Sequence, residues 1–324
     1  MNRRDFMTGA SGLVLAPGVA NAQLTPGLHR VGFMLGATPE SVVSLFEALR
    51  DGLRDRGYVE GRNLVLEARY GNGRMARLPE IAAELVRSHV EVIVTGTNIH
   101  VAAVRSVTTT VPTVMVFTSD PVGAGFVANL ARPGGNVTGL SADASPELWA
   151  KYLGLLREVS PRLAKVGALG QVDAHYGFAE LEVAARQQGI ALEIGDLTSI
   201  EAFEGVFAAL VGKRVDAVVV IVGPLTYQLR KAIGEAALRQ RVPTITTLSE
   251  YAHAGLLMSY GPNLDDLYHR AASYVDKILC GAKPAELPVE QPSRFELTVN
   301  LRTAKALGVN IPRSLQLLAA DVIA

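Results

Sequence analysis

Three short runs of small and polar residues have the composition of a site that binds a small molecule through backbone amides and hydroxyl groups. They are Gly36-Ala37-Thr38, Gly96-Thr97-Asn98 and Thr118-Ser119-Asp120, and each directly follows an apolar run. Backbone amides at a helix N-terminus, with a threonine or asparagine beside them, favour a carboxylate or another anion. Gly96-Thr97-Asn98 begins an amphipathic segment, so it is the best candidate for an anionic or amino-acid head group. Either polar residue alone could simply cap the helix.

A second set of candidates lies in the C-terminal half of the chain. Gln171, Asp173 and Tyr176 follow one predicted strand, and Gly223-Pro224 and Tyr227 follow another. The two tyrosines could form flat walls around an organic ligand and orient it through their hydroxyls, although Tyr227 could equally face the core. The candidate ligand-binding residues are Thr38, Gly96, Thr97, Asn98, Ser119, Asp120, Gln171, Asp173, Tyr176, Gly223, Pro224, Tyr227 and Glu250.

The two acidic candidates, Asp120 and Glu250, could bind a ligand amine. Asp120 precedes Pro121, which is also a common way to form a turn.

No catalytic or metal-binding pattern accompanies these residues. The histidines at positions 29, 89, 100, 175, 253 and 269 lack metal-ligand spacing, and the sequence has no phosphate loop or nucleophile elbow. Asp265-Asp266 fits the favourable charge of a first helical turn. We therefore expect no enzyme activity, no metal and no cofactor. The alternative is an exported enzyme that uses Asp120 or His175 as a base, although neither has an orienting partner in the sequence.

The candidates require parallel strands as their scaffold, because ligands in open α/β sheets lie beyond the carboxyl ends of the strands. From His29 onward, short β-branched runs alternate with longer amphipathic segments, which predicts strands joined by crossover helices. The predicted strands are residues 29–35, 63–70, 90–95 and 113–117, and the predicted helices are around 42–53, 77–88 and 98–107.

The same order of landmarks returns later in the chain. Val31-Gly32 recurs as Val166-Gly167, Val90-Glu91-Val92 as Val215-Asp216-Ala217, and Val111-Pro112-Thr113 as Val242-Pro243-Thr244. The displacements are 135, 125 and 131 residues. This near-constant spacing predicts two Rossmann-like lobes, each a small doubly wound α/β sheet.

The lobe boundaries follow from this repeat. Residues 28–143 plus 261–324 are predicted to form lobe 1, and residues 144–260 lobe 2. The C-terminal piece holds a long amphipathic helix, a proline-rich loop, a strand at 295–299 and a short helix capped by Asn300. It has no counterpart between the lobes, so we expect it to return to lobe 1. Several crossings of this kind would make a hinge about which the lobes close.

Residues 1–22 have the features of an export signal. Arg3-Arg4 precedes a short apolar stretch, and Ala20-Asn21-Ala22 suits a signal peptidase, which predicts cleavage before Gln23. The paired arginines followed by Phe6 resemble a twin-arginine signal; an ordinary Sec signal is the alternative. We expect a protein that diffuses freely in the periplasm of a Gram-negative cell, with no membrane anchor, because no cysteine follows the cleavage site.

Charge and cysteine content exclude several classes of partner and site. Without residues 1–22 the chain has 302 residues, 29 of them basic and 30 acidic, so it lacks the basic surface that nucleic acid requires. Cys280 is the only cysteine, which excludes an internal disulfide. Its apolar neighbours predict a buried thiol. We expect a monomer.

Several longer runs are distinctive enough to indicate a family. They are residues 127–139 (VANLARPGGNVTG), 255–262 (GLLMSYGP) and 288–292 (PVEQP), with Tyr58-Val59-Glu60-Gly61-Arg62-Asn63 and Phe295-Glu296-Leu297 in support. Over essentially the whole chain after residue 22, the sequence resembles the ABC transporter substrate-binding family that includes the TrpX-like proteins. The resemblance implies a type I periplasmic-binding fold, a small-molecule ligand in the cleft between the lobes, and delivery to an ABC permease with its ATPase.

The same resemblance says less about the ligand. Characterised relatives are similar in binding aromatic amino acids, but the usual asparagine- and proline-rich segment after the first strand of lobe 2 is here Gln171-Val172-Asp173-Ala174-His175. We expect a small organic ligand, with an amino acid as one candidate. A ligand-sensing subunit that docks on a membrane receptor is the alternative role.

Overall fold

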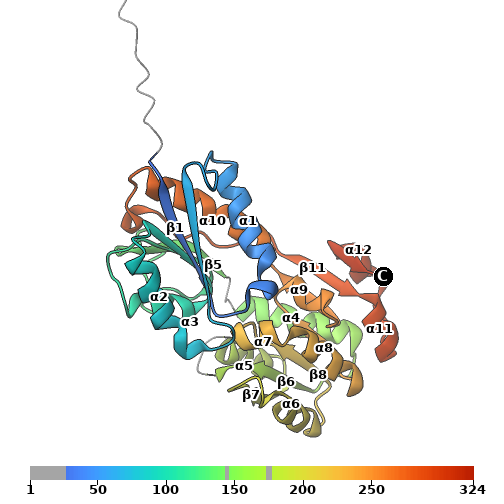
Figure 1. The fold of residues 1–324 in the computed structure, drawn as a ribbon. Coiled ribbons are helices and arrows are strands. Elements are labelled where there is room, and N and C mark those ends of the chain that lie inside the picture. The colour runs from blue at the N-terminus through green and yellow to red at the C-terminus, as the bar shows by residue number, and fades with distance from the viewer. Residues whose placement is uncertain (1–26, 143–145, 173–176) are drawn as a thin grey trace, which may run out of the picture.

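The computed structural model describes residues 27–142, 146–172 and 177–324. The predicted export signal at residues 1–22 lies outside these ranges. Figure 1 shows two α/β lobes, with the first half of the chain in the upper lobe and most of the second half in the lower one.

The first lobe is built on a five-stranded parallel sheet with the order β2-β1-β3-β4-β5. Its strands are β1 (His29–Leu35), β2 (Leu64–Tyr70), β3 (Val92–Thr95), β4 (Thr113–Ser119) and β5 (Val137–Ala142). Its helical segments are η1 (Pro39–Ser41), α1 (Val43–Arg54), η2 (Met75–Arg77), α2 (Leu78–Arg87) and α3 (Asn98–Arg105).

Helices cover both faces of this sheet. Val31 and Phe33 of β1 pack in the cluster that contains the buried residues of α1 and of α10 (Leu264–Leu279). Met34 points the other way and packs with residues of α2 and α3. This follows from the two-residue period of a strand, which explains why β1 is apolar at every position after Arg30 except Gly32.

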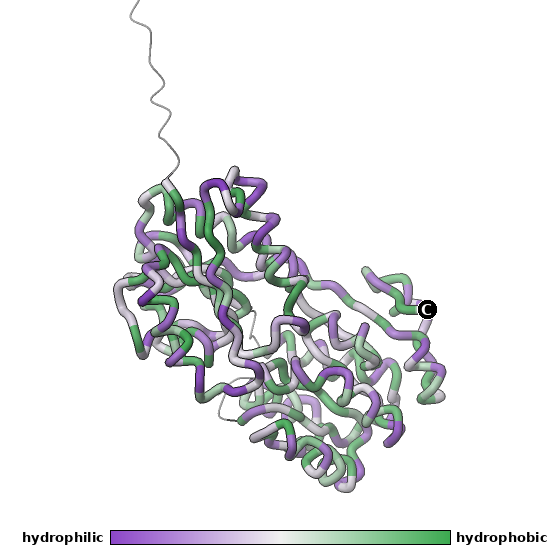
Figure 2. Tube along the Cα trace, viewed as in Figure 1, coloured by the Kyte–Doolittle hydropathy of each residue, from purple (hydrophilic) through white to green (hydrophobic). Residues whose placement is uncertain are grey.

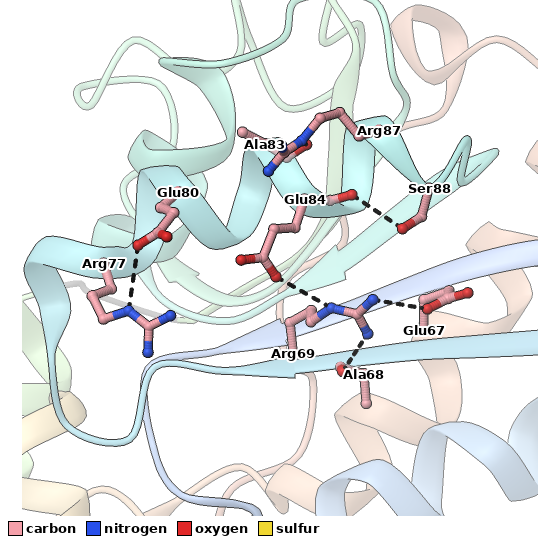
Figure 3. A network of polar contacts seen from close by, with 9 residues as sticks. All are labelled: Glu67, Ala68, Arg69, Arg77, Glu80, Ala83, Glu84, Arg87 and Ser88. Atoms are coloured by element: carbon pink, nitrogen blue, oxygen red, sulfur yellow. Dashed lines mark hydrogen bonds and ion pairs between the residues drawn. The ribbon is translucent and has the colours of Figure 1, made fainter.

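Ion pairs on the surface join α2 to the edge strand β2. The guanidinium of Arg69 lies 3.1 Å from a carboxylate oxygen of Glu67 and 3.5 Å from one of Glu84 on α2 (Figure 3). Arg77 and Glu80 form a further pair at the start of α2. Because these groups are partly exposed to water, the pairs add little stability, and the apolar face of α2 holds it in place.

The second lobe is built on a seven-stranded sheet with the order β12-β11-β10-β9-β8-β6-β7. Its strands are β6 (Lys165–Gly170), β7 (Ala191–Asp196), β8 (Ala217–Val220), β9 (Thr244–Thr246), β10 (Met258–Gly261), β11 (Glu296–Asn300) and β12 (Asp321–Ile323). The remaining helical segments are α4 (Pro146–Val159), α5 (Phe178–Gln187), α6 (Phe203–Gly212), α7 (Pro224–Gln228), α8 (Arg230–Arg239), α9 (Ser249–His253), η4 (Pro284–Glu286), α11 (Leu301–Leu307) and α12 (Arg313–Leu318).

The predicted duplication is confirmed by the strand order. Read from β7 to β10, the second sheet has the same order as the first, with β6 in the place of β1. The landmarks also occupy equivalent places. A carboxylate oxygen of Glu91, just before β3, accepts a hydrogen bond from the amide of Arg30, and Asp216, just before β8, accepts one from the amide of Lys165.

The expected return of residues 261–324 to lobe 1 is wrong for their last part. Helix α10 packs against α1 of the first lobe. Strand β11, however, pairs antiparallel with β10, and β12 pairs with β11, so residues 296–323 extend the second sheet. The physical reason is that β10 would otherwise leave an unpaired edge of backbone donors and acceptors.

The chain therefore passes between the sheets after β5, after β10 and again before β11. Before the last passage, the amide of Ser141 donates to the carbonyl of Glu290, and the Thr138 hydroxyl donates to that of Leu287, which ties the connection to β5. Several connections therefore join the two sheets, and closure of the lobes about them stays a prediction.

The prediction of a buried thiol at Cys280 is wrong. The cysteine follows the last residue of α10 and is exposed, because the apolar face of that helix ends at Ile278. Figure 2 shows apolar residues distributed through both lobes. Within the described ranges, no helix has both the length and the apolar composition needed to cross a bilayer.

Candidate functional site

A cavity lies between the two lobes, at the carboxyl ends of their strands. Residues that follow β1 and β3 and residues near the end of β4 form the first-lobe side, and residues that follow β8 and β9 form the other side. With the lobes packed as they are in this structure, the cavity has a volume of about 50 Å³, which is below the usual range of small-molecule sites. The lining residues are Leu35, Gly36, Ala37, Val42, Leu45, Gly96, Thr97, His100, Val116, Phe117, Val222, Gly223, Pro224, Tyr227, Leu248, Leu264 and Tyr268.

Most of this wall is apolar, and three aromatic rings contribute to it. The rings belong to Phe117, Tyr227 and Tyr268. Among the described residues that line the cavity, none has a carboxylate, ammonium or guanidinium side chain. Such a wall favours a ligand with a sizeable apolar or aromatic part and few polar groups.

A bulge in β4 places two consecutive residues on the cavity wall. The pairing of β4 with β5 shifts register between Val116 and Thr118, and Phe117 adopts a positive φ of 62°. A bulky residue in this region is strained by about 1–3 kcal/mol. Because the extra residue interrupts the alternation of the strand, Val116 and Phe117 both line the cavity.

The polar end of the cavity is formed by Thr97 and His100 at the start of α3. Thr97 occupies the N-cap position of α3, but its side chain does not cap the helix. The hydroxyl instead lies 3.0 Å from Nδ1 of His100, and Nε2 of His100 accepts a hydrogen bond of 2.8 Å from the amide of Gly36. Burial lowers the pKa of His100 to about 4, so the imidazole is neutral at physiological pH.

The second-lobe side is held by hydrogen bonds within the chain. The amide of Gly223 donates to the Thr226 hydroxyl (2.9 Å), and the amide of Leu225 donates to Oε1 of Gln171 (3.2 Å). These two amides at the start of α7 are therefore already paired. The helix contributes its apolar surface and the ring of Tyr227 to the cavity.

Tyr227 lies in a dense cluster of polar and aromatic groups. Its ring packs edge-on against Tyr251 at a centroid distance of 5.8 Å, and the guanidinium of Arg230 lies 4.5 Å from its centroid. Burial raises the pKa of the Tyr227 hydroxyl, and the nearby carboxylate of Glu250 raises it further. Burial likewise raises the pKa of Glu250, with a contribution from Asp265. The phenol of Tyr227 therefore stays neutral.

The two lobes touch directly beside the cavity. The guanidinium of Arg230 donates to the carbonyl of Ser41 in the first lobe at 3.4 Å. Gly73, in the loop after β2, lies so close to Gln228 of α7 that a Cβ on it would be 2.6 Å from Oε1. Buried apolar residues of both lobes also belong to one cluster. The lobes are thus packed together in this structure.

The cavity brings together some of the candidates predicted from the sequence. Gly96, Thr97, Gly223, Pro224 and Tyr227 line it.

The other described candidates make different contacts. Asn98 donates to the carbonyl of Ser119 and accepts from its amide, each at 2.9 Å. Asp120 is exposed and accepts from the amide of Gly123, as expected of a turn. The hydroxyl of Thr38 donates to that of Ser41.

Gln171 accepts a hydrogen bond from the amide of Leu225 in α7. Glu250 lies near Tyr227. Asp173 and Tyr176 lie outside the described residues.

Sequence reasoning missed His100, Phe117 and Tyr268. His100 follows Thr97 by three residues, a spacing at which a first-turn side chain can return to the N-cap, so its position carried a usable signal. Phe117 and Tyr268 carried none, because Phe117 belongs to an apolar run and Tyr268 to the apolar face of an amphipathic helix, and both patterns are also typical of core. In the described part of the chain, no group of three or more histidine, cysteine or acidic side chains is placed to hold a metal ion.

Comparison with known proteins identifies the family. The model for ABC transporter substrate binding proteins matches residues 38–323. The chain belongs to this family. The match includes both sheets apart from β1, so it covers almost all of the two-lobed body of this substrate-binding protein.

Individual relatives of this substrate-binding protein agree with that assignment. The tyrosine-binding protein of Clostridioides difficile (strain R20291) is 27% identical over 275 residues, which cover 84% of this chain and 76% of that one. A conserved domain protein from Vibrio cholerae O1 biovar eltor str. N16961 has a TM-score of 0.84 at 26% identity, and an ABC domain from Streptococcus pneumonia in complex with L-Trp has 0.83 at 23%. Both alignments cover 91% of this chain and 99% of the other. The predicted type I periplasmic-binding fold is confirmed.

Proposed function

We propose that this protein is the periplasmic solute-binding component of an ABC-type uptake transporter, and that it binds an amino acid with a large apolar or aromatic side chain in the cavity between its lobes. The observation that carries the proposal is the cavity itself. It lies at the carboxyl ends of both sheets and combines an apolar, aromatic wall with one polar end at Thr97 and His100.

The chemistry of the wall supports this class of ligand. Phe117, Tyr227 and Tyr268 offer aromatic surface to an apolar side chain, and the start of α3 offers hydrogen bonds to a head group. Two similar proteins, one tyrosine-binding and one in complex with L-Trp, support the same class of ligand. A binding protein of this kind releases its ligand unchanged, so we expect no turnover.

Closure about the hinge would trap the ligand. A ligand that contacts both lobes binds the closed state more tightly and so shifts the population towards it. The contacts of Arg230 with Ser41 and of Gln228 with Gly73 support closure, because each joins the two lobes next to the cavity. The predicted signal at residues 1–22 and the family support capture outside the cytoplasm and delivery to a permease with its ATPase.

The test is a thermal-shift screen of the purified protein against amino acids, other carboxylates and nucleobases, followed by calorimetry. A ligand that binds only the native state raises the melting temperature. At a ligand concentration of a hundred times Kd, it raises the free energy of unfolding by about 2.7 kcal/mol. We expect stabilisation by L-tyrosine, L-tryptophan or another large apolar amino acid. A screen in which no amino acid stabilises the protein, or in which a bound amino acid is consumed, would contradict the proposal.

A further inference from the structure

The buried imidazole of His100 joins two strand-end loops at the polar end of the cavity. The side chain is 4% exposed. Its Nε2 atom lies 2.8 Å from the amide nitrogen of Gly36, after β1, and its Nδ1 atom lies 3.0 Å from Oγ1 of Thr97, after β3. Both ring nitrogens are therefore paired within the protein, and His100 holds the two loops in a fixed relation.

These contacts determine which ring nitrogen carries the proton. A backbone amide can only donate, so Nε2 of His100 accepts from Gly36 and carries no hydrogen. Burial lowers the pKa of the ring to about 4, so a second proton is absent at neutral pH. A neutral imidazole has one N–H group, and here it is at Nδ1. This group donates to Oγ1 of Thr97.

The Thr97 hydroxyl can still donate its own hydrogen. Its oxygen accepts from His100 and does not cap α3. No other hydrogen bond of this hydroxyl is present in the described part of the chain, and Thr97 lines the cavity. A hydroxyl that already accepts one hydrogen bond is a stronger donor in the next. Because Thr97 lines the cavity, a ligand there could accept a hydrogen bond from this hydroxyl.

We propose that His100 is a positioning residue, which fixes the Thr97 hydroxyl as a hydrogen-bond donor to a carboxylate or carbonyl group of the ligand. The proposal rests on the proposed function, because it concerns the head-group end of the same cavity. The amide of Gly36, which could otherwise serve an anion, is taken by His100. The polar end of the cavity therefore selects ligands through the Thr97 hydroxyl.

The first experiment needs no ligand. Two-dimensional ¹H–¹⁵N NMR of the imidazole groups, with the signals of His100 assigned from a His100→Gln variant, reports which ring nitrogen carries the hydrogen. We expect the Nδ1–H tautomer at pH 7, and a disturbed Nδ1 signal in Thr97→Val. An Nε2–H tautomer, or an Nδ1 signal that Thr97→Val leaves unchanged, would overturn the proposal.

The second experiment measures the dissociation constant of L-tyrosine by calorimetry, with tyramine, which lacks the carboxylate, as the comparison. Thr97→Val and His100→Leu should each weaken L-tyrosine binding about tenfold, the effect of one hydrogen bond to a charged group. The double variant should be no weaker than either single one, since His100 acts through Thr97. His100→Gln, which can both donate and accept, should restore most of the affinity. Tyramine should bind the native protein and Thr97→Val equally weakly.

The two proposals fail in different ways. If Thr97→Val leaves the affinity for L-tyrosine unchanged, or if the two losses add in the double variant, His100 does not act through Thr97, while amino-acid binding stands. If the native protein binds neither L-tyrosine nor any other amino acid, the proposed function fails, and the NMR tautomer still decides whether His100 holds the hydroxyl. Thr97→Val keeps the shape of threonine and the bond from Gly36, so it serves even if His100→Leu does not fold.

Discussion

An alanine at Gly73 is expected to weaken ligand binding by crowding a contact between the two lobes. Gly73 lies in the loop after β2 with a φ of +78°. A Cβ at this position would lie 2.6 Å from Oε1 and 3.3 Å from Cδ of Gln228, on the other lobe. Oε1 of Gln228 is buried and has no hydrogen-bond partner among the described residues, and it is the far end of a flexible side chain. An added methyl group must therefore shift the Gln228 side chain.

The chain offers a matched control in the same lobe. Gly61 has the same φ of +78°, but a Cβ on it would meet nothing within 4 Å. Both substitutions introduce the same backbone strain, which destabilises the protein by about 1 kcal/mol for an L-residue in the left-handed region. Only Gly73→Ala also displaces Gln228, which adds about 1 kcal/mol for a strained side-chain torsion. This second cost corresponds to about a fivefold loss of affinity.

The assay combines calorimetric titration with thermal melts of the ligand-free protein. Both variants should lower the melting temperature alike, since the strain acts in the ligand-free state. Only Gly73→Ala should raise the dissociation constant, and Gln228→Ala in the same chain should restore it. Equal affinities for Gly73→Ala and Gly61→Ala would refute the reasoning, because the contact would then play no part in closure.

Three further outcomes are expected. The pKa of His100 is about 4 in the folded protein and 6.5 in an unfolded chain, so the unfolded state binds more protons between these two values. The free energy of unfolding should therefore fall by about 2 kcal/mol as the pH drops from 7 to 4.5. Urea unfolding of His100→Gln should not show this pH-dependent loss. Arg230→Ala, which loses its contacts with Tyr227 and Ser41, should raise the ligand dissociation constant about fivefold; an unchanged constant would show that this contact does not favour closure. Asn300→Ala removes the cap of α11 and should lower the free energy of unfolding by about 1–2 kcal/mol at constant ligand affinity; a change in affinity would tie this helix to closure.

Much of the local structure could be predicted from the sequence, because local structure depends on neighbouring residues. The first strand was predicted with its observed bounds, and Asn300 caps α11 through a bond from the amide of Thr303. The two lobes could be predicted because the same sequence pattern appears twice. The carboxylates of Glu91 and Asp216, for example, each accept a hydrogen bond from a backbone amide at the first strand of their lobe. The strand-end rule then located the cavity, and Gly96, Thr97 and Tyr227 line it.

The sequence alone determined the two-lobed α/β class, the family and the strand-end position of the site, since periodicity, repeats and long motifs are local properties of the chain. Only the tertiary structure decided that β11 completes the second sheet, that the bulge at Phe117 turns its ring to the cavity, and that Gly73 meets Gln228. Each of these features depends on pairing or packing between segments distant in sequence. An unpaired strand edge or a shared cavity then determines which distant segment makes the contact. The residue types involved are compatible with several arrangements, and the fold selects one.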